Sequence, residues 1–141
     1  MRLSVLDPNV HQELILLLYT ETLPYTKSHP SGITVAKLEE ECKKLDIKFI
    51  WRRKYWKDDD VCMNSIFVHI GQQDKKVVFF TKYLRHAFAH CQISEDNGII
   101  HAFCKYKDEF TGKCNGRKIF ELRISGKKLI DLLTFIRDNK S

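Results

Sequence analysis

The apolar positions along the first third of the chain recur with helical spacing. A first helix is predicted from about Pro8 to Thr22, with Asp7 as the cap that accepts hydrogen bonds from its first amides and Pro8 at its first position. Its middle is apolar on every side, which predicts that neighbouring helices or a second copy of the chain surround it. A second helix is predicted after the cap Thr34, because apolar residues follow one of its sides: Val35, Leu38, Cys42 and Leu45.

The middle of the chain continues this pattern after one interruption. From Ile47 to Asp60 the apolar period is lost, which predicts a loop or a short helix. A third helix is predicted from about Asp60 to Ile70, and a fourth from a cap at Asp74 to about Cys91. The apolar stripes that support these two helices are Met63, Ile66, Phe67 and Ile70 in the third and Val77, Phe80, Leu84, Phe88 and Cys91 in the fourth.

Strand-like alternation appears near the C-terminus. The segments from Ile99 to Tyr106 and from Lys118 to Ile124 alternate apolar and polar residues, and we expect them to pair as an antiparallel hairpin after a turn-rich link from Ser94 to Gly98. A last helix is predicted after the cap Ser125, with Leu129, Leu132, Leu133 and Ile136 along one side. The predicted fold class is therefore mainly α, a bundle of about five helices with an inserted antiparallel β-hairpin before the last helix.

The length and composition fit one globular domain spanning residues 1–141. With 43% hydrophobic and 30% charged residues, the chain is long enough to bury its own core. Its start has no apolar signal segment and no run approaches the length of a membrane span, so we expect a soluble, cytoplasmic protein without membrane contact. The five cysteines include no C-x-x-C pair, which favours reduced thiols. A net charge of +6 favours a polyanionic partner.

The aperiodic segment around two tryptophans has two interpretations. Between Trp51 and Lys57, aromatic residues are interleaved with four cations, a composition typical of surfaces that stack on bases and hold phosphates of single-stranded nucleic acid. Trp51 and Trp56 would alternatively be packing anchors, with the cations solvated or paired to the aspartates that follow. We favour the packing interpretation.

One short stretch, from Tyr83 to Cys91, concentrates residues suited to phosphate chemistry. Arg85 carries a guanidinium that can grip a phosphate through two hydrogen bonds, and His86 and His90 carry imidazoles that gain or lose a proton near neutral pH. On an ideal helix, Arg85 and His90 differ by ~140° around the axis and ~7.5 Å along it. One straight helix therefore cannot bring both to a single phosphate, unless His90 lies where the helix frays or the missing partner comes from another subunit. In the second case we expect a shared site across the two-fold axis of a homodimer.

The segment Leu84-Arg85-His86-Ala87-Phe88-Ala89-His90 resembles the R-x4-H signature of the HEPN superfamily, small helical proteins that include many metal-independent ribonucleases. In that superfamily the residue after the arginine is commonly polar, and His86 fits this position. The hairpin and closing helix that follow also resemble some of its branches. The resemblance thus covers the predicted layout of most of the chain and, in specific motif, only this short segment.

The resemblance implies an endoribonuclease that needs no metal or other cofactor. Arg85 would hold the scissile phosphate and stabilise its developing charge, while His90 would act as general base or acid in attack by the ribose 2′-hydroxyl. His86 would orient the substrate or share the proton transfer. RNA is then the substrate, and the resemblance alone implies prokaryotic defence or toxin–antitoxin biology, with a regulatory protein such as an antitoxin as a further partner.

The same residues support other interpretations. In an inactive relative, Arg85 and His90 would serve only RNA binding or dimerisation. His86 and His90 lie one helical turn apart beside Cys91, a spacing that can hold zinc, but no third and fourth ligands are evident. In a purely structural role, His90 would cap the last carbonyls of the helix while His86 is solvated. Cys91 as a nucleophile lacks an acid or oxyanion partner.

Overall fold

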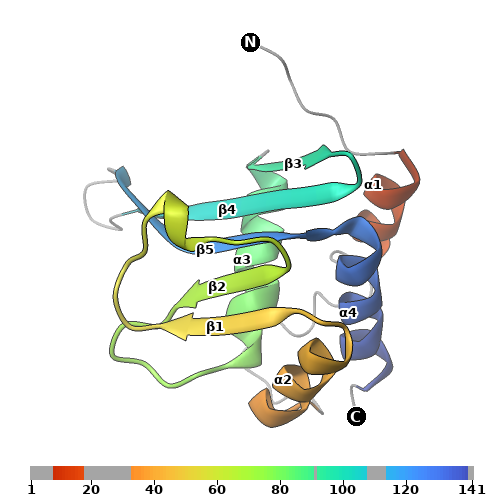
Figure 1. Ribbon diagram of the computed structural model, residues 1–141, viewed down its shortest axis with the longest axis horizontal. Coiled ribbons are helices and arrows are strands. Elements are labelled where there is room, and N and C mark those ends of the chain that lie inside the picture. The colour runs from red at the N-terminus through yellow and green to blue at the C-terminus, as the bar shows by residue number, and fades with distance from the viewer. Residues whose placement is uncertain (1–7, 18–32, 91, 108–113, 140–141) are drawn as a thin grey trace.

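The computed structural model describes residues 8–17, 33–90, 92–107 and 114–139, and their ribbon is shown in Figure 1. This length contains both helices and strands. In chain order the elements are α1 (Pro8–Ile15), α2 (Val35–Lys44), β1 (Lys48–Arg52), the short 3-10 helix η3 (Asp58–Asp60), β2 (Ser65–His69), α3 (Val77–Ala89), β3 (Ile93–Asp96), β4 (Ile99–Lys107), β5 (Cys114–Ser125) and α4 (Gly126–Asp138).

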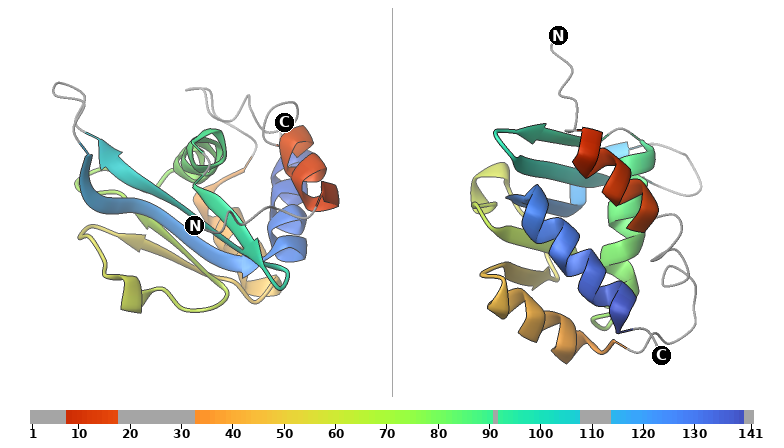
Figure 2. Two further views of the ribbon diagram at one scale, coloured as in Figure 1. Left: turned by 90° about the horizontal axis from the view of Figure 1, so that it is seen from above. Right: turned by 90° about the vertical axis from the view of Figure 1, so that its right-hand side faces the viewer.

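The five strands form one mixed sheet in the order β1-β2-β5-β4-β3. β1 and β2 are parallel, whereas the other neighbouring strands are antiparallel. The four α-helices lie on one face of this sheet, which we call the inner face, and the crossover from β1 to β2, with η3, lies on the other, outer face (Figure 2). A parallel pair requires such a crossover, because the chain must return to the starting edge before it can form the second strand.

The main core lies between the inner face and the helices. Alternate residues of the central strands, among them Ile66, Leu122 and Ile100, are fully buried there. They pack against the apolar sides of the helices, such as Leu84 of α3 and Leu133 of α4. Alternation along strands and helical spacing along helices thus meet in a single apolar layer.

A second, smaller core lies on the outer face. Trp56 and Val61 of the crossover pack with Phe67 of β2, and Ile50 of β1 flanks them. The guanidinium of Arg53 also donates hydrogen bonds to backbone carbonyls after β2, with a nitrogen to oxygen distance of 2.9 Å to Gly71. The crossover is therefore held against β1 and β2.

The prediction of a mainly α bundle is wrong, because the structure is an α/β fold built on a five-stranded sheet. The predicted helix from Asp60 to Ile70 contains the central strand β2. Ile66 and Val68 of this strand face the helices while Phe67 faces the crossover, so apolar residues follow one another without alternation. Such a run fits helical spacing as well as a strand that is covered on both faces.

Two further segments differ from the prediction for related reasons. The aperiodic segment after Ile47 begins with strand β1, whose residues turn towards both cores. The predicted turn-rich link from Ser94 to Gly98 is mostly strand β3, and only Asn97 and Gly98 make the turn into β4. Both have positive φ, at 52° and 80°, as a two-residue hairpin turn of this kind requires.

The other predicted elements are confirmed where the structure describes them, except that α3 begins at Val77 with Lys76 as its N-cap and not after the predicted cap Asp74. Thr34 caps α2 and Ser125 caps α4, each accepting a hydrogen bond from the backbone amide three residues later. The antiparallel pair β4 and β5 corresponds to the predicted hairpin. The start of α1 is as predicted, whereas Asp7 and the end predicted near Thr22 lie outside the described residues. Within the described parts of the chain, no helix is long and apolar enough to cross a membrane.

Candidate functional site

Helix α3 presents the residues that the sequence predicts as a site. One side of the helix is buried against the sheet through Val77, Phe80, Leu84 and Ala87. The motif residues lie away from this buried side. His86 is exposed, and so is His90, which follows the last turn of the helix, whereas Arg85 is half-buried. The exposed Lys82 lies one turn before His86. We call Lys82, Arg85, His86 and His90 the α3 cluster.

The two imidazoles of the α3 cluster are neighbours. The ring centroids of His86 and His90 are 6.1 Å apart, with an angle of 47° between the ring planes. His90 is the C-terminal cap of α3, and its backbone N–H donates a 3.0 Å hydrogen bond to the carbonyl of His86. The end of the helix thus fixes the spacing of the two rings, and both remain accessible to a ligand.

The electrostatic surroundings of His86 favour its neutral form. Partial burial of the imidazole lowers its pKa below the usual 6.5, and the positive charges of Lys82, His90 and Arg85 lower it further. A neutral imidazole at neutral pH has a free ring nitrogen that can accept a proton. His86 is therefore suited to act as a base, whereas the sequence motif assigned the leading role to His90.

The structure adds one aromatic neighbour from α1 that the sequence pattern did not indicate. The ring of His11 stacks on Phe88 of α3, with centroids 5.3 Å apart and an angle of 21° between the planes. His11 lies about seventy-five positions before the motif, so only the tertiary packing brings the two helices together. The stack supports the C-terminal turns of α3 from the side of α1.

The zinc interpretation gains no further ligand. Among the residues that the structure describes, no group of three or more His, Cys, Asp or Glu side chains could hold a metal ion. Cys91, the neighbour invoked for both the metal and the nucleophile interpretations, lies outside the described residues. His86 and His90 thus stand as a pair.

A second polar cluster, missed by the sequence interpretation, lies on the outer face of the sheet. The carboxylate of Glu121 is buried and accepts three hydrogen bonds: from the Trp56 indole at 3.0 Å, from the His101 imidazole at 2.6 Å and from the Lys118 ammonium at 3.1 Å. Burial raises the pKa of this carboxyl, but the hydrogen bonds from the three partners and the charge of Lys118 lower it more, so the net shift is downward. Glu121 is consequently ionised at neutral pH.

The only sequence signal for this cluster was an acid inside an alternating strand. Glu121 occupies a polar position between Phe120 and Leu122, which the alternation pattern places on the face away from the core. Its burial depends on Trp56, which arrives from the crossover 65 residues earlier. No local pattern could have revealed that contact.

The tryptophans of the aperiodic segment are packed, as the favoured interpretation expected. Trp56 is buried beside Phe67, and Trp51 packs on Phe49 of the same strand with ring centroids 4.7 Å apart. The ring of Tyr55 instead stacks on His69 at 4.2 Å, with Arg117 of β5 5.0 Å from its centroid. The segment therefore combines packing anchors with an aromatic ring on the outer face.

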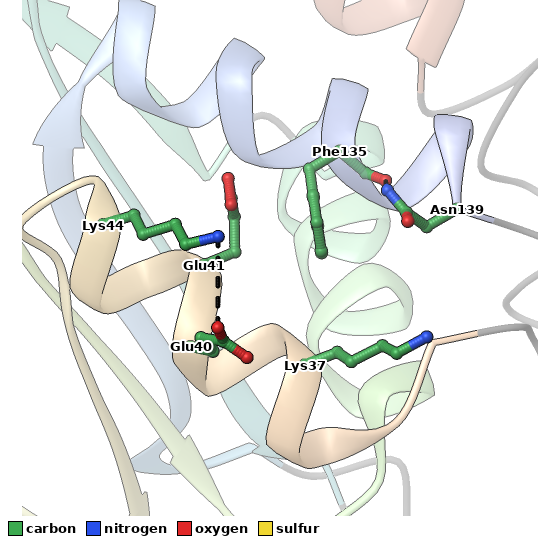
Figure 3. Close-up of a pocket in the computed structure, with 6 residues that line it drawn as sticks. All are labelled: Lys37, Glu40, Glu41, Lys44, Phe135 and Asn139. Atoms are coloured by element: carbon green, nitrogen blue, oxygen red, sulfur yellow. Dashed lines mark hydrogen bonds and ion pairs between the residues drawn. The ribbon is translucent and has the colours of Figure 1, made fainter.

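A shallow pocket between α2 and α4 is a weaker candidate. Its volume is about 190 Å³, below the range of about 300–1,000 Å³ usual for small-molecule sites. Acidic and basic side chains mix along its wall, and Lys44 pairs with Glu40 at 4.0 Å in an exposed ion pair of small energetic weight (Figure 3). The residues that line it are Lys37, Glu40, Glu41, Lys44, Phe135 and Asn139.

Two arrangements of side chains are thus suited to chemistry or binding. The α3 cluster contains the three residues predicted from the sequence, Arg85, His86 and His90. The Glu121 cluster joins the crossover to β4 and β5. Comparison of the chain with protein-family models, with curated proteins and with solved structures found no match.

Proposed function

We propose that this protein binds RNA and cleaves it without a metal ion, using the α3 cluster. The observation that carries the proposal is the pair of exposed imidazoles, His86 and His90, whose ring centroids are 6.1 Å apart beside the cations Lys82 and Arg85. Two proton carriers and a source of positive charge are the groups that 2′-hydroxyl attack on a phosphodiester needs.

The chemistry follows from the different positions of the two rings. Neutral His86 takes the proton of the ribose 2′-hydroxyl as its oxygen attacks phosphorus, and His90 acts as the acid that gives a proton to the departing 5′-oxygen. One P–O bond forms and one breaks, which leaves a 2′,3′-cyclic phosphate and a free 5′-hydroxyl. Because the attacking and leaving oxygens lie on opposite sides of phosphorus, two rings separated in this way are suited to flank one phosphate.

The positive charges supply the second part of the mechanism. The guanidinium of Arg85 holds the nonbridging oxygens and stabilises the charge that grows on them, and Lys82 adds to the positive field. In a helix, residues at successive positions point about 100° apart, so Arg85 leans away from the His86 and His90 side of its own α3. We therefore include a homodimer in the proposal, in which Arg85 of one protomer completes the histidine pair of the other.

The HEPN resemblance supports this proposal at the level of the motif. The helical-bundle layout that it implied is not the fold of this chain, so the resemblance rests on the segment from Leu84 to His90. On the same basis we extend the proposal to a cytoplasmic toxin or defence ribonuclease whose activity a regulatory protein such as an antitoxin restrains.

A second candidate is a non-catalytic module for RNA binding or dimerisation. The observation that favours it is the half-buried position of Arg85, which already makes contacts within the protomer. A guanidinium held in this way can bind a phosphate even if it does not stabilise the transition state of cleavage. This candidate differs from the first in predicting RNA binding without cleavage.

Incubation of the purified protein with RNA in EDTA tests the proposal. Wild type is compared with Arg85→Ala, His86→Ala and His90→Ala, and the matched control Lys127→Ala removes an exposed charge from α4. We expect wild type and the control to cleave RNA but not DNA of the same sequence, because DNA lacks the nucleophile. Loss of a proton carrier should slow cleavage by roughly 10²–10⁴-fold.

Each other outcome has a distinct meaning. RNA binding without cleavage by wild type would replace the proposal with the binding module. Cleavage that EDTA abolishes would contradict the metal-free mechanism. Cleavage that survives both histidine substitutions would remove His86 and His90 from the chemistry.

A further inference from the structure

The outer face of β4 and β5 carries a set of side chains that the proposed cleavage mechanism does not use. Residues paired directly across neighbouring strands point to the same face of a sheet, which places Arg123 beside His101 and Glu121 beside Phe103. Lys118 joins this face through its hydrogen bond to Glu121. We call His101, Phe103, Lys105, Lys118, Glu121 and Arg123 the outer β-surface.

The charge of the outer β-surface is positive. Lys105, Lys118 and Arg123 are cations, and His101 adds an imidazole, whereas Glu121 is the single acid of the set. The Glu121 carboxylate is buried, with a side chain 2% exposed, and three donors occupy it. The Glu121 carboxylate is therefore shielded from a ligand, which would meet the cations of this surface.

An aromatic ring lies at the centre of these cations. The ammonium groups of Lys118 and Lys105 are 5.3 Å and 5.8 Å from the centroid of the Phe103 ring, and the His101 ring is 5.7 Å away. Nearby, the Arg117 guanidinium lies over the ring of Tyr55, which itself stacks on His69. Rings and guanidinium planes surrounded by cations are the elements that bind the bases and phosphates of an unpaired strand.

We propose that the outer β-surface binds single-stranded RNA, with Phe103 stacking on a base while Lys105, Lys118 and Arg123 contact phosphates. The positive charge favours a polyanionic ligand, and the half-exposed ring favours a polyanion with unpaired bases. The choice of RNA rests on the proposed function.

The chain itself connects this surface to the α3 cluster. The backbone N–H of Phe103 donates a 3.1 Å hydrogen bond to the carbonyl of Gln92, which lies two residues after His90. Two residues of chain span at most about 7 Å. The Phe103 backbone thus lies near the end of α3, but its ring points to the outer face whereas α3 packs on the inner face, so an RNA strand would reach both sites only by passing around the β3 edge of the sheet.

Binding of a non-cleavable strand tests this inference apart from cleavage. The probe is a fluorescent, fully 2′-O-methylated RNA oligonucleotide, and anisotropy measures its dissociation constant. Phe103→Leu keeps apolar volume but removes the stacking ring, and we expect roughly tenfold weaker binding. Lys105→Ala, an exposed position, should weaken binding and reduce its salt dependence. The matched control is Lys37→Ala, which removes another exposed lysine, on α2.

The outcomes separate this inference from the proposed function. Weaker binding by Phe103→Leu and Lys105→Ala, with Lys37→Ala unchanged, supports the outer β-surface even if wild type cleaves no RNA. Unchanged binding by both variants overturns it even if the α3 cluster proves catalytic. Equal affinity for a blunt RNA duplex of the same sequence would also overturn it, because paired bases cannot stack on Phe103.

Discussion

The Trp56 indole N–H donates a 3.0 Å hydrogen bond to Oε1 of Glu121, joining two residues 65 positions apart in the chain. The bond fixes the crossover between the parallel strands to the centre of the sheet. It also satisfies one oxygen of a carboxylate that is almost wholly buried, while His101 and Lys118 satisfy the other. Removing any of these donors leaves a buried charge with fewer partners, which is costly.

The first prediction concerns the stability that this bond provides. Trp56→Phe keeps a large ring against Phe67 but removes the indole donor, so we expect the free energy of unfolding to fall by about 1–3 kcal/mol. Urea unfolding at pH 7 measures this loss. A variant as stable as wild type would show that the carboxylate finds another donor.

The pH dependence of Glu121 gives a second prediction. Because the folded protein lowers the pKa of this carboxyl below its usual 4.5, the stabilisation is present above pH 4.5 and is lost as the pH falls through the folded value. The stability difference between wild type and Glu121→Gln should therefore be largest near neutral pH and shrink below pH 4.5. Paired urea unfolding curves across this range measure it. A difference that does not change with pH would contradict an ionised Glu121.

A third prediction concerns the imidazole of His86. Its pKa in the folded protein should lie below 6.5, with partial burial as the main cause and Lys82 as a contributor. Lys82→Ala should raise this pKa because it removes one of the neighbouring charges. Titration of the imidazole protons by NMR measures both values, with Lys127→Ala as the charge-matched control. An unchanged His86 pKa in Lys82→Ala would show that the Lys82 charge does not act on this imidazole.

The sequence correctly predicted the helices and strands that have one buried face and one solvent-exposed face. The helices after Thr34 and Ser125 and the pair of C-terminal strands show a clear apolar period together with a cap or alternation. The prediction failed at β2, where the crossover covers the outer face and Phe67 is as buried as its neighbours. A strand that is buried on both faces loses the period that would identify it.

The candidate site divides in the same way. Arg85, His86 and His90 could be found from the sequence because they share one helix and one short motif. His11 and Glu121 could not, because each acquires its partner through tertiary packing: His11 with Phe88 and Glu121 with Trp56. Local spacing indicates the residues of one element but not those that the fold brings together.

A fourth prediction tests the homodimer. If Arg85 of one protomer completes the histidine pair of the other, Arg85→Ala and His90→Ala should each be inactive alone. After mixing and exchange of subunits, about a quarter of all sites would be intact, and RNA cleavage should recover to roughly that fraction of wild type. Mixtures that stay inactive, or a monomer by light scattering at micromolar concentration, would remove the shared site.

The most direct test of the cleavage proposal is identification of the RNA products formed in EDTA. A site with two proton carriers and no metal should leave a 2′,3′-cyclic phosphate and a 5′-hydroxyl, and the yield of both should fall by roughly 10²–10⁴-fold in His90→Ala. Mass spectrometry of the fragments from wild type, His90→Ala and Lys127→Ala measures this yield. A 3′-hydroxyl with a 5′-phosphate, or equal yields from wild type and His90→Ala, would contradict it.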